Sequence, residues 1–131
     1  MRFYQAAPDE VTTRYIVHEH HQGYPGVVHG GIVAAMLDEV CARVFMNTDS
    51  ARFMFSARLE IRYRKNVPVG KPLTLSGKAV RDRGRTAEAI GFIHDEQGNL
   101  LAEANVLLVE VPGDTLPPAD LEALGWKVYP E

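Results

Sequence analysis

The pattern of hydrophobic and polar positions changes its period along the chain, and the first change predicts a strand followed by a buried helix. Residues 12–20 have the composition of a strand, and a turn-rich run follows them. Residues 27–46 are then apolar on nearly all sides, which is typical of a helix without a solvent-exposed face. Gly30 and Gly31 would weaken the interior of such a helix, so we expect them at its start.

Beyond this helix the period is two, which predicts antiparallel strands. Odd positions from Phe53 to Tyr63 are apolar and even positions are polar, apart from Met54, as in a long half-buried strand. This alternation places Ser56 on the polar face of the strand. Short turns then separate three further strand-like runs, at residues 72–81, 85–94 and 100–111.

Two smaller patterns concern the packing of one strand and the C-terminal end of the chain. In the second of these runs, Ala87, Ala89 and Gly91 leave room for a bulky neighbour on one face of the strand. Near the C-terminus, residues 117–124 are followed by Gly125, which predicts a short helix with a glycine cap.

The order of the predicted elements defines a fold class. A strand, a buried helix and four antiparallel strands follow one another without an internal repeat or a long linker. A single antiparallel sheet that wraps around one apolar helix buries the apolar faces of both. We therefore predict one α+β domain over residues 1–131, a length that buries roughly two thirds of the unfolded surface.

Composition excludes several classes of protein. No stretch approaches the ~18 apolar residues of a membrane span, and the N-terminus has no apolar core of a signal peptide, so we expect no membrane partner. Cys41 is the only cysteine, which rules out an internal disulfide and a cysteine-based zinc site. We therefore expect a cytoplasmic protein.

The net charge is only −3, but the charges are segregated. Residues 52–85 hold ten of the fourteen Lys and Arg residues and two acidic residues, so this segment carries +8 and the remainder −11. A basic segment on an acidic chain favours an anionic ligand over nonspecific DNA binding. No aromatic pattern of an RNA-binding domain interleaves with it, so we expect no nucleic-acid partner. A solvated strand face is the alternative explanation.

The sequence GYPGVVHGGIVAAMLDE at residues 23–39, followed by four strands, resembles the hotdog-fold thioesterase superfamily. The likeness is to its small acyl-CoA thioesterases, in which His-Gly-Gly opens the central helix and an acidic residue follows nine positions after the histidine. His29, Gly30 and Gly31 match that motif, and Asp38 stands at the acidic position. The resemblance covers about residues 12–111 and implies a hotdog fold, an antiparallel sheet around one long central helix.

The resemblance implies that the backbone amide of Gly30 polarises the thioester carbonyl. Elementary physics supports such a role, because a helix N-terminus presents unpaired N–H groups and the positive end of a dipole. Glycine at positions 30 and 31 also lets a substrate approach the backbone closely, which assigns Gly31 to substrate binding. The alternative is that Gly30 and Gly31 merely let the helix pack against a strand.

Two adjacent acids on the apolar helix are candidates for the base or nucleophile. An ionised carboxylate in such a helix is unfavourable unless it is paired or hydrated, and a carboxylate kept there is a candidate for chemistry. Asp38 has the family spacing from His29, whereas Glu39 lies about 100° around the helix and is the alternative acid. Asp38 attacks the carbonyl directly or deprotonates a water, and the residues leave both open. Pairing with an arginine at a subunit interface is the structural alternative.

Three further residues are assigned supporting roles. Ser56 stands where related enzymes have a Ser or Thr that helps to position the water, although a solvated serine explains it equally well. We expect His29 to orient the helix start rather than to act as a base. Several relatives carry Asn, Gln or His about six residues before the motif histidine, where this chain has Gly23. The neighbouring Gln22 is therefore our candidate for that polar contact.

A metal site and several cofactor sites lack support. Alternation would place His18 and His20 on one strand face, beside His21, but no acidic third ligand is spaced to complete a metal site. The chain also lacks the GxxxxGK[ST], GxGxxG and GxSxG motifs of phosphate-binding loops, dinucleotide sites and serine hydrolases. We expect no metal and no cofactor.

The resemblance gives the basic segment a specific interpretation. Coenzyme A carries phosphates at the end of its pantetheine arm, and arginines at a tunnel mouth would hold them. In the family the nucleotide lies near the strand turns. The residues of the VRDRGR turn assigned to CoA are Arg81, Arg83, Gly84 and Arg85, with Arg62, Arg64 and Lys65 as second choices.

The resemblance implies hydrolysis of an acyl-CoA to a carboxylic acid and CoA. One alternative is a hotdog dehydratase or hydratase, whose loop resembles HFPGxPVxPG, but His29 replaces the proline that would follow the second valine. The other is a non-catalytic acyl-CoA-binding regulator. Such a regulator would be expected to carry a DNA-binding segment, for which we expect 131 residues to leave no room.

The separation of Gly30 and Asp38 along the predicted helix predicts the oligomeric state. Gly30 and Asp38 are eight residues apart in sequence, which is roughly 12 Å along one helix. A polarising amide and an attacking carboxylate must both come within about 3–3.5 Å of one reacting carbonyl group. Two antiparallel helices related by a two-fold axis meet this requirement. We therefore predict an obligate homodimer with two composite sites, which can pair further into a dimer of dimers.

Overall fold

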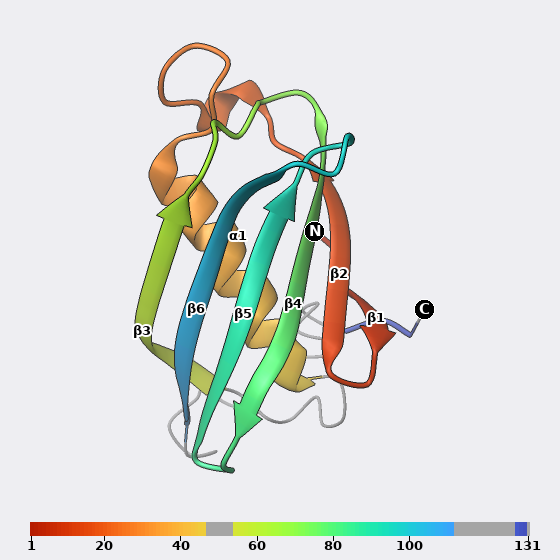
Figure 1. Cartoon of the computed structure of the whole chain (residues 1–131), viewed down its shortest axis with the longest axis vertical. Coiled ribbons are helices and arrows are strands. Elements are labelled where there is room, and N and C mark those ends of the chain that lie inside the picture. The colour runs from red at the N-terminus through yellow and green to blue at the C-terminus, as the bar shows by residue number, and fades with distance from the viewer. Residues whose placement is uncertain (47–53, 112–127, 131) are drawn as a thin grey trace.

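The computed structural model describes residues 1–46, 54–111 and 128–130, in which a single antiparallel sheet curves around a long helix (Figure 1). The helix α1 spans Gly30–Arg43, and the 3-10 turns η1 (Glu19–His21) and η2 (Val44–Met46) lie before and after it. The strands are β1 (Tyr4–Ala7), β2 (Glu10–Ile16), β3 (Met54–Tyr63), β4 (Pro72–Asp82), β5 (Thr86–His94) and β6 (Leu100–Glu110). Their order across the sheet is β1-β2-β4-β5-β6-β3, so β1 and β3 are the edges. The predicted α+β architecture is confirmed.

The N-terminal prediction was wrong in two respects. The short edge strand β1 was not predicted, because its four residues lack an apolar alternation. The strand predicted at residues 12–20 ends at Ile16. The backbone then turns, since the Nδ1 atom of His18 accepts a hydrogen bond from the amide of His20 at the start of η1. Predictions that fall on residues 47–53 and 112–127, including Phe53 and the C-terminal helix, lie outside the described residues.

The helix α1 packs against the inner face of the sheet, where two glycines allow a close approach. A Cβ atom added at Gly77 of β4 would lie 2.8 Å from the backbone oxygen of Val40, and one at Gly91 of β5 would lie 2.8 Å from Sγ of Cys41. The small-residue face predicted on β5 therefore does accommodate a bulky neighbour, which is α1. The helix is not buried on every side, however, because Ala35 is exposed.

Gly77→Ala is expected to lower the free energy of unfolding by about 1–3 kcal/mol, because the new methyl group would meet helix backbone rather than a movable side chain. Urea denaturation measures this change. The matched control is Ser76→Ala, which alters the opposite face of the same strand and is expected to change stability by less than about 0.5 kcal/mol. Equal effects of the two substitutions would contradict the close approach of α1 at Gly77.

A bulge in β3 alters which residues face the helix. The register between β3 and β6 shifts between Ser56 and Arg58. Ser56 and Tyr63 both hydrogen-bond to residues of α1, although residues seven positions apart in a regular strand point to opposite faces. The prediction that Ser56 lies on the face opposite Tyr63 was therefore wrong, because the bulge is invisible in the alternation of residue types.

The strand register fixes which ends of the elements meet. Tyr63, at the end of β3, pairs with Ala102, which in turn pairs with Ile93 near the end of β5. The turn between β4 and β5 therefore lies at the other end of the sheet from Tyr63 and the start of α1 (Figure 1). None of the helices in the described residues is both long and apolar enough to cross a membrane.

Candidate active site

The start of α1 is held by the side chain of the residue that precedes it. His29 is the N-cap, and its Nδ1 atom accepts a hydrogen bond of 2.9 Å from the amide of Gly31. The loop before it is ordered in the same way, because Oε1 of Gln22 accepts a bond of 3.1 Å from the amide of Gly26. His29 thus caps the helix start, and the Gln22 side chain hydrogen-bonds within its own loop.

The Gly30 amide differs from its neighbours at the helix start. The carbonyl of the preceding residue, His29, accepts bonds from the amides of Ile32 at 2.9 Å and Val33 at 3.1 Å. These bonds polarise the peptide group to which the Gly30 N–H belongs. Among the described residues nothing accepts a hydrogen bond from this N–H, whereas the Gly31 N–H is used by the His29 cap. The first turn therefore presents one polarised, available donor.

There is room for a side chain at Gly30, so packing does not require glycine at this position. An added Cβ atom would make only ordinary contacts, the nearest being 3.7 Å from the Tyr63 hydroxyl. Glycine in place of alanine in a helix destabilises it by roughly 0.5–1 kcal/mol. The packing alternative for Gly30 is thus not supported. At Gly31 a Cβ atom would lie 3.1 Å from Nδ1 of His29, so this glycine serves the cap.

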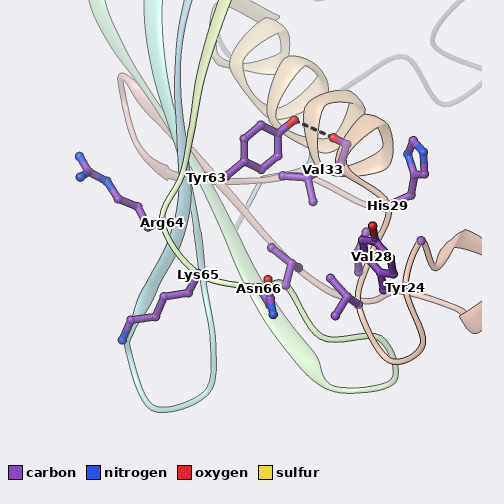
Figure 2. A pocket seen from close by; sticks show the side chains of 12 residues that line it. Tyr24, Val28, His29, Val33, Tyr63, Arg64, Lys65 and Asn66 are labelled. Atoms are coloured by element: carbon purple, nitrogen blue, oxygen red, sulfur yellow. Dashed lines mark hydrogen bonds between the residues drawn. The ribbon is translucent and has the colours of Figure 1, made fainter.

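A cavity of about 550 Å³ lies at this end of the helix. Its walls combine residues from the loop before α1, the first turn of α1 and the segment that follows β3 (Figure 2). Figure 2 shows the Tyr63 side chain pointing to the helix start, whereas Arg64 and Lys65 point outward from the same strand end. The residues that line the cavity include Tyr24, Val28, Gly30, Val33, Tyr63 and Asn66.

The two acids of α1 have different partners. The hydroxyl of Ser56 donates a hydrogen bond to Oδ1 of Asp38, which brings together two predicted site residues. Glu39 instead forms an ion pair with Arg43, whose Nη2 atom lies 2.9 Å from Glu39 Oε1. The alternative acid is therefore neutralised within its own helix, whereas the Asp38 carboxylate, which is half-buried, is oriented by a hydroxyl group.

Cys41 lies one turn beyond Asp38 and is completely buried. Burial raises the pKa of the Cys41 thiol to about 12, and the negative charge of Asp38 contributes to the same shift. At neutral pH the thiol is therefore protonated and is not a nucleophile.

A family model described as Thioesterase superfamily matches residues 25–102, which is more than half of the chain. The chain belongs to the thioesterase superfamily. The matched segment begins in the loop before α1 and ends in β6, so it includes the helix, its capping residue and most of the cavity wall.

Named relatives and solved structures agree with this membership. Mouse acyl-coenzyme A thioesterase 13 is 23% identical over 100 residues, which cover 75% of this chain and 71% of the relative. Rat acyl-coenzyme A thioesterase THEM4 is 26% identical over 113 residues, which cover 86% of this chain but 48% of the relative, so the chain spans about half the length of the rat protein. The structure of smu.793 from Streptococcus mutans, bound to acetyl CoA, has a TM-score of 0.76 at 19% identity and covers 84% of this chain and 87% of that one.

One chain of this superfamily member does not bring all the predicted site residues together. Gly30 and His29 line the cavity, whereas Asp38 lies further along α1 and Ser56 lies near the start of β3, and neither of the two lines the cavity. The assigned CoA residues at the end of β4 and in the turn to β5 are exposed and lie at the opposite end of the sheet from Gly30. These residues are Arg81, Arg83, Gly84 and Arg85.

Two of the histidines before α1 lie close together. The rings of His18 and His20 are 4.1 Å apart, although the two residues lie at η1 and not on a strand face as predicted. In the described residues no group of three or more His, Cys, Asp or Glu side chains could hold a metal ion.

Sequence reasoning missed Tyr63 as a member of the site. Its hydroxyl donates a hydrogen bond of 2.8 Å to the carbonyl of Gly30. The sequence marks Tyr63 only as the last apolar position of a long strand. Nothing in the pattern shows that this strand end lies level with the helix start, which depends on how the sheet curves around α1.

Proposed function

We propose that this thioesterase-superfamily protein hydrolyses the thioester bond of an acyl-CoA, releasing a carboxylic acid and free CoA. One observation carries the proposal: the Gly30 N–H is polarised, has no acceptor among the described residues and opens onto a cavity from a residue without a side chain. Such a donor suits the oxygen of a thioester carbonyl, where negative charge develops during attack. The names of the mouse and rat relatives support the same substrate class.

The proposed reaction divides the work between an amide and a carboxylate. The Gly30 N–H donates to the carbonyl oxygen and draws electrons from the carbonyl carbon. Asp38 then attacks that carbon, forming an anhydride that water hydrolyses, or it takes a proton from a water that attacks. In either route the C–S bond breaks and CoA leaves as a thiolate that takes up a proton. The Ser56 hydroxyl, bonded to Asp38, orients the carboxylate.

A homodimer belongs to this proposal, because one helix holds both groups too far apart. Among the described residues strand β3 has a neighbour on one side only, and its exposed residues include Phe55 and Leu59, 57% and 37% exposed. An unpaired edge with apolar side chains is suited to pairing with another strand. The outer side of α1 carries Gly31 and Ala35, whose small size allows a second helix to approach closely. A two-fold axis near β3 and α1 would place Gly30 of one copy opposite Asp38 of the other.

The same two-fold axis would bring the arginines of the turn between β4 and β5 near the substrate. Within one chain Arg83 and Arg85 lie at the end of the sheet away from Gly30, and so away from a thioester bound there. In the proposed dimer the helices are antiparallel, which brings this turn of the second copy toward the Gly30 cavity of the first. We propose that the turn contacts the CoA phosphates across the interface.

Replacing Arg83 and Arg85 by Ala is expected to raise KM for an acyl-CoA at least about 5-fold, while turnover of the matching N-acetylcysteamine thioester stays nearly unchanged. The lost contacts bind remote phosphates and not the reacting carbonyl. Steady-state kinetics with the two substrates measures the difference. The control is the pair Arg14→Ala and Lys78→Ala, which removes the same charge from β2 and β4. Equal damage to both substrates would contradict the phosphate role.

A panel of acyl-CoAs, assayed by release of free thiol, tests the proposed function directly. Hydrolysis of at least one acyl-CoA, with stoichiometric carboxylic acid, is the expected result. Hydration of an enoyl-CoA without thiol release would instead show a hydratase. Binding of acyl-CoA without any turnover would show a non-catalytic binding protein.

A further inference from the structure

We infer that Tyr63 is a positioning residue, whose hydroxyl holds the first turn of α1 so that the Gly30 N–H points at the thioester carbonyl. The inference rests on the proposed function and extends it to a residue of the edge strand β3. Its starting point is the bond of 2.8 Å from the Tyr63 hydroxyl to the Gly30 carbonyl.

The first turn of α1 needs such a support because it begins with two glycines. Glycine has the largest backbone freedom of any residue, and Gly30 and Gly31 have no Cβ atoms through which packing could fix them. An oxyanion donor acts effectively only when its direction is fixed before the reaction. Without side chains at positions 30 and 31 a substrate can approach the backbone, but the Gly30 N–H donor is then also less firmly held.

Hydrogen bonds on both sides of Gly30 supply the missing constraint. The peptide group before Gly30 is held through the His29 carbonyl, which accepts bonds from Ile32 and Val33 within the helix. The peptide group after Gly30 is held at its oxygen by Tyr63 and at its N–H by Nδ1 of His29. The Gly30 N–H belongs to the first of these peptide groups, and fixing the second limits rotation about the Gly30 backbone that joins them.

Tyr63 differs from the other supports because it comes from the sheet. Its ring also lies against Gly30, since an added Cβ atom there would be 3.8 Å from Cε1 and from Cζ of the ring. The hydroxyl proton is directed at the Gly30 carbonyl, which points along the helix away from the N–H. Tyr63 thus acts through Gly30 and not on the substrate.

Tyr63→Phe removes only the hydroxyl, and Tyr4→Phe is the matched control, because Tyr4 lies on β1 at the opposite edge and its ring packs at a tilt against Tyr129. We expect Tyr63→Phe to lower kcat about 10-fold with KM within about 2-fold, a smaller loss than the roughly 10²–10³ of a direct oxyanion donor. We also expect the NMR cross-peak of the Gly31 amide to shift and its proton to exchange with solvent at least about 3-fold faster. The exchange rates of amides in the later turns of α1 should be unchanged.

The amide measurement separates this inference from the proposed function. If the wild-type protein hydrolyses no acyl-CoA, the proposed function fails, and the Gly31 amide still shows whether Tyr63 holds the turn. A kcat and a Gly31 amide that both match those of Tyr4→Phe would overturn the inference. Faster exchange along the whole of α1, with a lowered Tm, would also overturn it, because that result indicates general destabilisation of the fold.

Discussion

Asp38→Asn is expected to lower kcat for acyl-CoA hydrolysis by at least about 100-fold, as when a base or nucleophile is removed. Asparagine retains an oxygen that accepts the Ser56 hydroxyl bond, so the local contact survives while the negative charge is lost. Replacing a half-buried carboxylate by a neutral amide also removes a desolvation penalty. We therefore expect the fold to persist, with an unchanged circular dichroism spectrum and a Tm no lower than that of the wild type.

Glu39→Gln is the matched control on the same helix. It removes the ion pair with Arg43, so some stability is lost, but the carboxylate concerned is not directed at Ser56. Turnover per folded molecule should remain near the wild-type value. The opposite pattern, an inactive Glu39→Gln and an active Asp38→Asn, would transfer the role to Glu39.

Mixing two inactive variants is expected to restore activity if the site is shared between copies. Gly30→Pro removes the proposed donor and retains the helix, because proline is tolerated at the first helical position. The preceding residue is compatible with it, since His29 has φ −56° and ψ 137°. Asp38→Ala removes the carboxylate. Random pairing of equal amounts gives about half heterodimers, each with one intact site, so activity should recover to about a quarter of the wild type.

The controls for this experiment concern assembly. Native mass spectrometry should show the heterodimers after the mixture has been unfolded and refolded together. Each variant refolded alone should remain nearly inactive. Abundant heterodimers without recovered activity would place both groups in a single chain and contradict the composite site.

The sequence was sufficient for the elements that depend on local periodicity. Two-residue alternation identified β3, and strand-like runs between short turns identified β4, β5 and β6. The apolar run with its leading glycines identified α1 and its start. The short edge strand β1 was not predicted because four residues are too few to show a period. The prediction for β2 was too long because the turn at His18 depends on a side-chain hydrogen bond.

The candidate site was predictable in its residue types more than in its geometry. The motif spacing singled out Gly30 and Asp38, and the structure adds the available amide and the contact with Ser56. That contact conflicts with simple alternation, since the bulge in β3 turns Ser56 toward the helix. The role inferred for Tyr63 had no counterpart in the sequence pattern, because it depends on which strand end meets the start of α1.

The buried Cys41 has a practical consequence for measuring this chemistry. Its thiol is the only one in the chain, lies against the position of Gly91 in the sheet and stays protonated because burial raises its pKa to about 12. A disulfide reagent such as Ellman's reagent reacts with thiolates at accessible positions. In the native protein such a reagent therefore reports only the coenzyme released, with no background from the enzyme. In denaturant the same reagent labels molecules in which the Cys41 thiol has become accessible, and the labelling rate measures how often α1 separates from the sheet.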